Sequence, residues 1–393
     1  MSDNQRKLRI GITHGDFNGV SYEIIIKSLA EAEILDLFTP VIFGSSDVAA
    51  RTTTRLNMHD FWFSVVKDMT EIEDDKINFV DVCGPSPHQT LGMPSEEAGK
   101  AAVAALDAAC RALENGEIDL LVTAPINKHT VQSEEFKFPG HTEFLEARFA
   151  DENSKATMIL FADKLRVATV TGHIPLAEVA GKITKERVAE AIENFNKALK
   201  ADFRCERPKI AVLSLNPHCG DNGTLGHEEI DSIRPAIEEC VNKGILAFGP
   251  FAADGLFGSD AYTHYDGILA MYHDQGLAPF KALAENRGVN YTAGLRIVRT
   301  SPAHGTAYDK AGHGTVDHTS MREALYAAAD IYRNRNDFKA ASANPLKINE
   351  KTPKENKGRK PEPLFLEAKK DGKKQDQNKD GNAAGEKPTE KKN

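Results

Sequence analysis

Between Leu8 and Arg333 the sequence alternates short apolar runs with longer helical stretches, and this alternation constrains the fold more than any other feature. Helical stretches occupy residues 95–116 and 184–200, among others. Between such stretches lie short runs, bounded by Gly, Pro, Asn or His, that read as buried strands: LRIGIT, PVIFGS, DLLVTAP, ATMILFA, RVATVTG, KIAVLSL and GILAMY. The pattern predicts an α/β fold in which helices cover both faces of a sheet.

The last part of the chain has a different composition. Residues 345–393 are rich in Lys, Asn, Gly and Pro, and they carry 14 Lys and Arg against 9 Asp and Glu. Such a segment buries too little apolar area to offset its conformational entropy. We therefore expect a catalytic α/β region over 1–344, with two subdomains because the chain exceeds one compact core, and a disordered Lys-rich tail over 345–393.

Charge and hydropathy exclude several classes of partner. The net charge is -9, and without its basic tail the chain carries about -14, which argues against binding to nucleic acid. No apolar run is long enough to cross a bilayer, and the polar N-terminus lacks a signal-peptide pattern. The five cysteines stand singly, without a CxxC pair. We therefore expect a cytoplasmic protein with reduced thiols and no membrane partner.

Three histidines occupy the same position relative to predicted strands. His173 follows RVATVTG, His218 follows KIAVLSLNP, and His273 follows GILAMY. In open α/β sheets the carboxyl ends of the strands meet at the ligand crevice, and imidazole is the commonest metal ligand. Three of them with an open position would make a catalytic site for a divalent cation. No HExxH motif is present to fix a metal site, so the alternative is that these histidines are structural residues of loops.

Cationic side chains gather close to the third histidine. Lys281 and Arg299 lie among apolar residues in FKALAENRGVNYTAGLRIVRTS, and Asn290 lies between them. Because the rest of the chain is acidic, these cations suggest a pocket for a phosphate or carboxylate. Arg287, in the same stretch, reads instead as part of a solvated surface.

Two further segments offer polar side chains for a site. His141 and Thr142 follow a Pro-Gly turn at the start of a predicted helix, where anions are favoured, although Thr142 would also suit a helix cap. Asp254, in FAADGLF, could orient a histidine or act as a base, or could belong to a surface turn. Neither a G-x-G-x-x-G nor a P-loop motif is present.

Taken together, the motifs PGHTE, LNPH, AMYHDQG, RGVN and RTSPAHGTAYDKAGHG resemble, in order and spacing, the 4-hydroxythreonine-4-phosphate dehydrogenase family of vitamin B6 biosynthesis. The resemblance runs from about Ile10 to Ala329. The last motif is also similar to the dinucleotide loop of isopropylmalate and isocitrate dehydrogenases. The resemblance implies their two-subdomain α/β fold, with the active site in the cleft between the subdomains.

The resemblance also implies roles for individual residues. The three strand-end histidines would hold a divalent metal (zinc, cobalt or magnesium) at a homodimer interface: His173, His218 and His273. The phosphorylated substrate would be bound by His141, Thr142, Lys281, Asn290 and Arg299. The NAD loop would contain His304, Gly305 and Thr306, and the catalytic residues would be Asp254 and Lys281. The first loop departs from the family's GDPAGIGPE, reading GDFNGVSYE, so no role is transferred to it.

The implied reaction is NAD- and metal-dependent oxidation of 4-phosphohydroxy-L-threonine. The product, 2-amino-3-oxo-4-phosphooxybutanoate, would decarboxylate to 3-amino-2-oxopropyl phosphate on the way to pyridoxal 5'-phosphate. Two alternatives remain open at this point. The substrate could be 4-phosphothreonate or 4-phosphoerythronate, or the chain could be a metal-dependent phosphate-ligand protein without redox activity.

Overall fold

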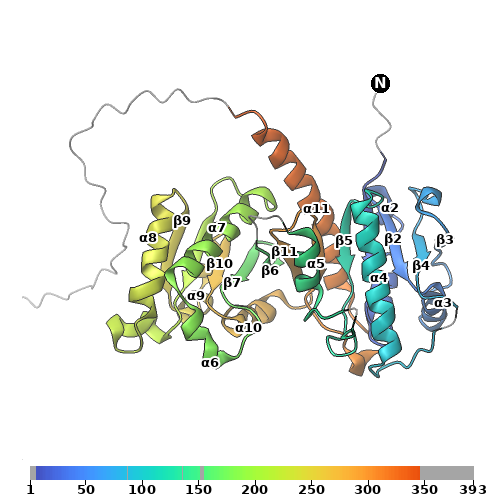
Figure 1. Ribbon diagram of the computed structural model, residues 1–393, viewed down its shortest axis with the longest axis horizontal. Coiled ribbons are helices and arrows are strands. Elements are labelled where there is room, and N and C mark those ends of the chain that lie inside the picture. Colours follow the sequence, from blue (N-terminus) through green and yellow to red (C-terminus); the bar gives the residue numbers. More distant parts are fainter. Residues whose placement is uncertain (1–5, 86, 135, 151–154, 346–393) are drawn as a thin grey trace, which may run out of the picture. The chain divides into compact units, whose positions relative to one another are not determined.

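A computed structural model describes residues 6–85, 87–134, 136–150 and 155–345, and its strands form one sheet (Figure 1). The predicted disordered tail lies outside the described residues from 346 onward. The strands are β1 (Arg9–Thr13), β2 (Thr39–Gly44), β3 (Ser64–Val66), β4 (Asn78–Asp81), β5 (Leu120–Thr123), β6 (Thr157–Ala162), β7 (Leu165–Thr169), β8 (Lys209–Leu213), β9 (Leu246–Phe251), β10 (Gly267–Ala270), β11 (Val289–Ala293) and β12 (Arg299–Pro302).

Helices connect most of these strands, as the alternating sequence pattern predicts. They are α1 (Ser21–Ser28), α2 (Ile34–Leu37), α3 (Ser46–Arg55), α4 (Glu96–Glu114), α5 (His141–Phe149), α6 (Leu176–Val179), α7 (Lys185–Ala201), α8 (Arg234–Asn242), α9 (Ala253–Phe257), α10 (His273–Ala284) and α11 (Thr319–Ser342). The two longest predicted helical stretches appear as α4 and α7. Each begins after a capping hydroxyl, on Ser95 and Thr184 respectively, which accepts a hydrogen bond from a backbone N–H of the first turn.

The sheet has the order β3-β4-β2-β1-β5-β12-β11-β6-β7-β10-β8-β9. The first six strands are parallel to one another, and the last four, β7, β10, β8 and β9, form a second parallel block. Between them β11 is antiparallel to both of its neighbours, and β6 pairs antiparallel with β7. The strand direction therefore reverses in the middle of the sheet, and the two blocks point in opposite directions.

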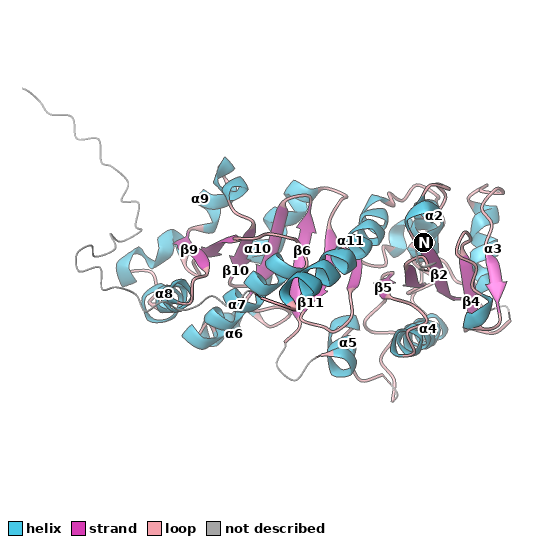
Figure 2. Cartoon of the chain, turned by 90° about the horizontal axis from the view of Figure 1, so that it is seen from above, coloured by secondary structure: helices cyan, strands magenta, loops and turns pink. Residues whose placement is uncertain are grey.

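Helices pack against both faces of the sheet, so the strands are apolar along most of their length (Figure 2). The buried apolar residues form one large cluster that includes α1, α7, α8 and α11, and two smaller ones under α4 with α5 and under α9 with α10. The predicted α/β fold class is confirmed. All seven apolar runs named above are strands, and no described helix is both long and apolar enough to cross a membrane.

Candidate active site

A cavity of about 1180 Å³ lies over the central strands, at the point where the strand direction reverses. Its floor includes Met158 of β6, Thr169 of β7, Asn290 of β11 and Arg299 of β12. Residues of α5, α7 and α10 form its walls. Ligands of α/β sheets bind in crevices where the order or direction of strands changes, so the position of this cavity suits a binding site.

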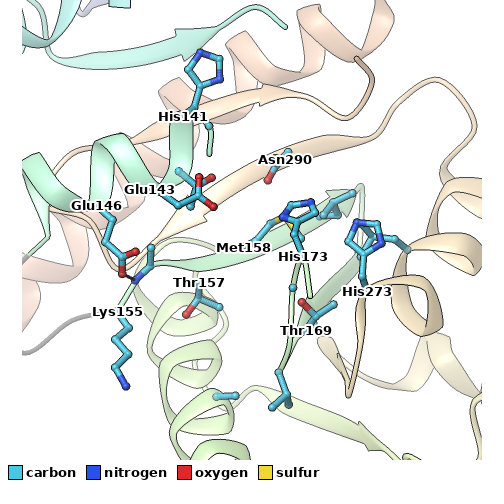
Figure 3. Close-up of a pocket in the computed structure, with 18 of the residues that line it drawn as sticks. His141, Glu143, Glu146, Lys155, Thr157, Met158, Thr169, His173, His273 and Asn290 are labelled. Atoms are coloured by element: carbon cyan, nitrogen blue, oxygen red, sulfur yellow. Dashed lines mark hydrogen bonds between the residues drawn. The ribbon is translucent and has the colours of Figure 1, made fainter. Parts of the chain in front are cut away.

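Two of the predicted metal ligands lie side by side in this cavity. The rings of His173, after β7, and His273, at the start of α10, have centroids 5.2 Å apart (Figure 3). Nδ1 of His273 lies 2.7 Å from Oδ1 of Asp274, and a proton on Nδ1 leaves the Nε2 lone pair free for a metal. Burial, followed by the charges of Lys128 and His273, lowers the pKa of His173, which favours the neutral ligand form.

The third histidine lies elsewhere. His218 follows β8, which is the neighbour of β10 in the sheet, but its side chain is exposed and does not line the cavity. The chain there enters a left-handed stretch, with φ of 53° at His218 and 54° at Cys219. Consequently no group of three His, Cys, Asp or Glu side chains in the described part of this single chain is placed to hold a metal.

One end of the cavity is built to receive an anion. Arg299 is only 3% exposed, and its guanidinium donates hydrogen bonds to the hydroxyls of Thr123, at 2.6 and 3.1 Å, and Thr292, at 3.2 Å. Burial lowers its pKa to about 10, with Glu143 acting in the opposite direction. Burial, then Arg299, also lowers the pKa of His141 well below its usual value. An incoming phosphate would neutralise this buried cation.

Three other predicted substrate residues line the same cavity: Thr142, Lys281 and Asn290. Lys281 is exposed on α10, so its ammonium can move to meet a ligand. Oδ1 of Asn290 is buried and has no hydrogen-bond partner among the described residues. A buried acceptor without a donor is unfavourable unless a ligand supplies the donor, so Asn290 marks a binding position.

The predicted cofactor loop reaches the cavity through His304 and Gly305. Nδ1 of His304 lies 2.9 Å from the carbonyl oxygen of Gly305, while its buried Nε2 has no partner among the described residues. Gly305 is exposed, with open space around it. Thr306 does not line the cavity; its carbonyl oxygen accepts a hydrogen bond from the backbone N–H of Val20 at 3.0 Å.

The predicted base, Asp254, lies outside this cavity. It is exposed in the first turn of α9, and its carboxylate accepts a hydrogen bond from the N–H of Gly255 at 2.8 Å. Sequence reasoning assigned no site role to several charged residues that line the cavity, among them Lys128 and Glu143. Lys128 follows β5, and this post-strand position is the same signal that identified the histidines. Glu143 lies one residue beyond Thr142 in the PGHTE motif.

Comparison with known proteins shows which family this chain belongs to. Residues 36–328 match the family model described as "Pyridoxal phosphate biosynthetic protein PdxA". The chain is 53% identical, over 87% of its length and 94% of the relative's, to a 4-hydroxythreonine-4-phosphate dehydrogenase of Bacteroides thetaiotaomicron. It is 39% identical, over 83% of its length and 98% of the relative's, to an Oceanobacillus iheyensis protein provisionally named D-threonate 4-phosphate dehydrogenase.

A solved structure agrees with these relatives. The crystal structure of a 4-hydroxythreonine-4-phosphate dehydrogenase from Burkholderia phymatum superposes with a TM-score of 0.67 and 36% sequence identity. The alignment covers 84% of this chain and 99% of that one. The similarity therefore extends over the whole sheet and the cavity rather than over one motif.

Proposed function

The chain belongs to the pyridoxal phosphate biosynthetic PdxA family of oxidoreductases, and we propose that it oxidises 4-phosphohydroxy-L-threonine with NAD and a divalent metal. The product, 2-amino-3-oxo-4-phosphooxybutanoate, then decarboxylates to 3-amino-2-oxopropyl phosphate. One observation carries this proposal most. One cavity combines a buried Arg299, which has no ion pair among the described residues, with the adjacent imidazoles of His173 and His273. The cavity thus has a phosphate end at Arg299 and a reacting end at the two histidines.

Arg299 is the proposed anchor of the substrate phosphate, because its buried guanidinium forms no ion pair among the described residues. His141 and Thr142 begin α5, so the N–H groups of this helix terminus add to the anion site. Lys281 provides a mobile cation at the rim. Asn290 is assigned to a substrate hydroxyl, which would donate to its unpartnered Oδ1.

The donor set of one chain supplies two imidazoles for a metal, and we assign the third to His218 of a second copy. His218 is exposed, as required of a residue that completes a site across an interface. Three imidazoles suit zinc or cobalt, and magnesium would need added waters. When bound, the metal lowers the pKa of the substrate hydroxyl as a Lewis acid. The proposed assembly is therefore a homodimer with shared sites.

The loop of His304, Gly305 and Thr306 is assigned to NAD. Nε2 of His304 is a buried acceptor without a partner among the described residues, which fits a hydroxyl of the cofactor, and Gly305 leaves room for close approach. When held by this loop, NAD would supply the hydride acceptor for oxidation of the substrate carbon. Lys281 lines the cavity and is assigned to return a proton to carbon after carbon dioxide leaves. Asp254 is the proposed base, and because it lies outside the cavity of its own chain, we assign it to the cavity of the second copy.

A substrate panel tests the reaction. We expect NADH to form, measured by absorbance, with 4-phosphohydroxy-L-threonine and added metal, and to cease after thorough chelation. Arg299→Met should raise KM for this substrate, whereas Arg287→Met, a change at an exposed arginine outside the cavity, should not. NADH formation that is undiminished in chelated enzyme would refute the metal assignment.

Mixing inactive variants tests the shared site. His218→Ala and His273→Ala remove ligands that, in our proposal, come from different copies of the chain. Mixed dimers would contain one intact site, so remixing should restore about a quarter of wild-type activity. If both ligands came from one chain, each site of a mixed dimer would lack one of them, and remixing would restore no activity. His173→Ala mixed with His273→Ala is the control, because these two histidines lie side by side in one chain and the mixture should not recover.

Two other functions remain candidates. The Oceanobacillus iheyensis relative favours a 4-phosphothreonate substrate, and 4-phosphoerythronate is chemically close to it. The same panel decides among these by kcat/KM. A metal-dependent phosphate-ligand protein without redox activity would bind phosphate but not NAD, which titration calorimetry distinguishes. The cytoplasmic location stays a prediction from the N-terminal sequence.

A further inference from the structure

The loop between β1 and α1, residues 15–20, is buried although it is polar. Asp16 is 1% exposed and Asn18 is 0% exposed. Loops normally lie on the surface because a buried loop must satisfy every backbone and side-chain polar group internally. This is also the loop whose sequence departs from the family pattern. Its partners therefore indicate what the altered loop does in this chain.

Residues 89–95 hydrogen-bond to Phe17 and Asn18, and the other ends of the loop, Asp16 and Val20, contact the segment that follows β12, which contains the proposed NAD loop. The hydroxyl of Tyr308 donates to Oδ2 of Asp16 at 2.6 Å and accepts from Nδ2 of Asn127 at 3.0 Å. The N–H of Val20 donates to the carbonyl oxygen of Thr306 at 3.0 Å. A Cβ on Gly19 would lie 2.5 Å from that same oxygen, so only glycine permits this approach.

Helix α1 holds the far end of the same segment. Oε1 of Glu23 accepts a hydrogen bond from the N–H of Val316 at 2.9 Å. Nζ of Lys27 donates to the carbonyl oxygens of Gly314, at 2.9 Å, and Val316, at 3.0 Å. Residues 16–27 thus fix the segment at both ends. His304 and Gly305, which face the cavity, lie just before the first fixed point.

The backbone beside this fixed point is strained. Ala307 adopts φ 44° and ψ 54°, a left-handed conformation that is unfavourable for a residue with a Cβ. Such a conformation persists only when its surroundings enforce it, and here the hydrogen bonds on Thr306 and Tyr308 flank it on both sides. Without them the loop would relax toward another conformation, and the cavity-facing residues would move with it.

We propose that Asp16 and Tyr308 are positioning residues for the dinucleotide site: their hydrogen bond holds the loop His304–Tyr308 in the conformation that binds NAD. The hydroxyl of Tyr308 also joins this loop to Asn127, whose neighbour Lys128 lines the substrate side of the cavity. The inference rests on the proposed function, since it takes NAD as the ligand of this loop. It gives the altered first loop a role that needs no direct contact with the cofactor.

Two variants test the inference, and one control separates it from a loss of fold stability. Tyr308→Phe removes the hydroxyl and keeps the ring, while Asp16→Asn keeps the shape and weakens the acceptor. Tyr291→Phe is the control, because Tyr291 also donates from a buried hydroxyl to an aspartate, Asp202, at 2.6 Å, but does not contact this loop. We expect all three to lower the melting temperature of the full-length protein.

Only Tyr308→Phe and Asp16→Asn should weaken NAD binding, by about tenfold in the Kd measured by calorimetry, which is the usual effect of losing a hydrogen bond to a charged group. Amide exchange of residues 304–310 should accelerate in the same two variants without any ligand. KM for the phosphorylated substrate should change by less than KM for NAD.

The outcomes are distinguishable. If wild-type protein fails to bind NAD, the proposed function is wrong and the inference is wrong with it. If wild-type protein binds NAD and both variants bind it as tightly, with unchanged exchange at residues 304–310, only the inference is overturned. Should Tyr308→Phe fail to fold, Asp16→Asn alone decides by the same two measurements.

Discussion

Replacing Arg299 with methionine gives a sharp test of the anion site, because the effect on stability should be small and the effect on phosphate binding large. Arg299 is 3% exposed, and its hydrogen bonds go to two threonine hydroxyls, with no ion pair among the described residues. Burial accordingly lowers its pKa to about 10. A methionine side chain fills much of the same volume without the charge.

The magnitude follows from two opposing terms. At about 1.4 kcal/mol per pH unit, the lowered pKa corresponds to about 3 kcal/mol of unfavourable free energy for the buried cation at neutral pH. The hydrogen bonds from the charged guanidinium to Thr123 and Thr292 offset about 1.5 kcal/mol each. We therefore expect the free energy of unfolding of Arg299→Met, without anion, to lie within about 1 kcal/mol of the wild-type value. A structural ion pair of the same burial would lose about 3 to 5 kcal/mol.

The assay is urea unfolding of the full-length protein with and without inorganic phosphate at constant ionic strength. Saturating phosphate, at about 100 times its Kd, should stabilise the wild type by about 2.7 kcal/mol. Arg299→Met should lose that stabilisation, and Arg287→Met should keep it. A large loss of stability without anion, or full stabilisation of Arg299→Met by phosphate, would show that Arg299 is structural.

Three further predictions concern the body of the fold. Burial lowers the pKa of His14 to about 4. The free energy of unfolding should therefore fall by about 3 kcal/mol as the pH drops from about 6.5 to about 4, because the buried imidazole must stay neutral. Urea titration of His14→Phe should not show this loss. Gly99→Ala should destabilise the protein by about 1 to 3 kcal/mol in the same titration, since its Cβ would overlap the carbonyl oxygen of Thr130. Burial raises the pKa of Cys83 and Cys110 to about 12, so both should react with a thiol reagent at neutral pH only after unfolding.

The strands that the sequence predicts well are those that form continuous apolar runs. The run TPVIFG of β2 is buried at every position, and a continuous apolar run is readily recognised. By contrast β11 (VNYTA) and β12 (RTSP) escaped prediction as strands. Each contributes a polar side chain to the cavity, Asn290 and Arg299, and this interrupts the apolar pattern. At β11 and β12 the functional side chains therefore obscure the local signal.

The cavity residues divide in a similar way. Motif resemblance identified Arg299, Asn290 and His304 as candidates, and all three line one cavity. Lys128 was missed as a site residue because it is one of many polar residues in the long connection between β5 and α5 and belongs to none of the quoted motifs. Only tertiary structure shows that this loop, the start of α5 and the loop after β12 meet over the same strands.

The strand-end rule explains both what was found and what was not. β7, β10 and β8 are adjacent and parallel, so their carboxyl ends lie at one edge of the sheet, as the three post-strand histidines required. The rule fixes where a strand ends but not where the chain goes next. After β7 and β10 the chain turns at once and brings His173 and His273 together.

After β8 the chain takes a different course. The N–H groups of Leu215 and Asn216 donate to the carboxylate of Glu229, and the left-handed turn that follows leaves His218 at the surface. His218 is thus exposed on a turn that these hydrogen bonds fix, and its side chain has no hydrogen-bond partner within the described part of its own chain. That is the arrangement expected if its partner is a second copy, and the mixing of His218→Ala with His273→Ala measures it directly.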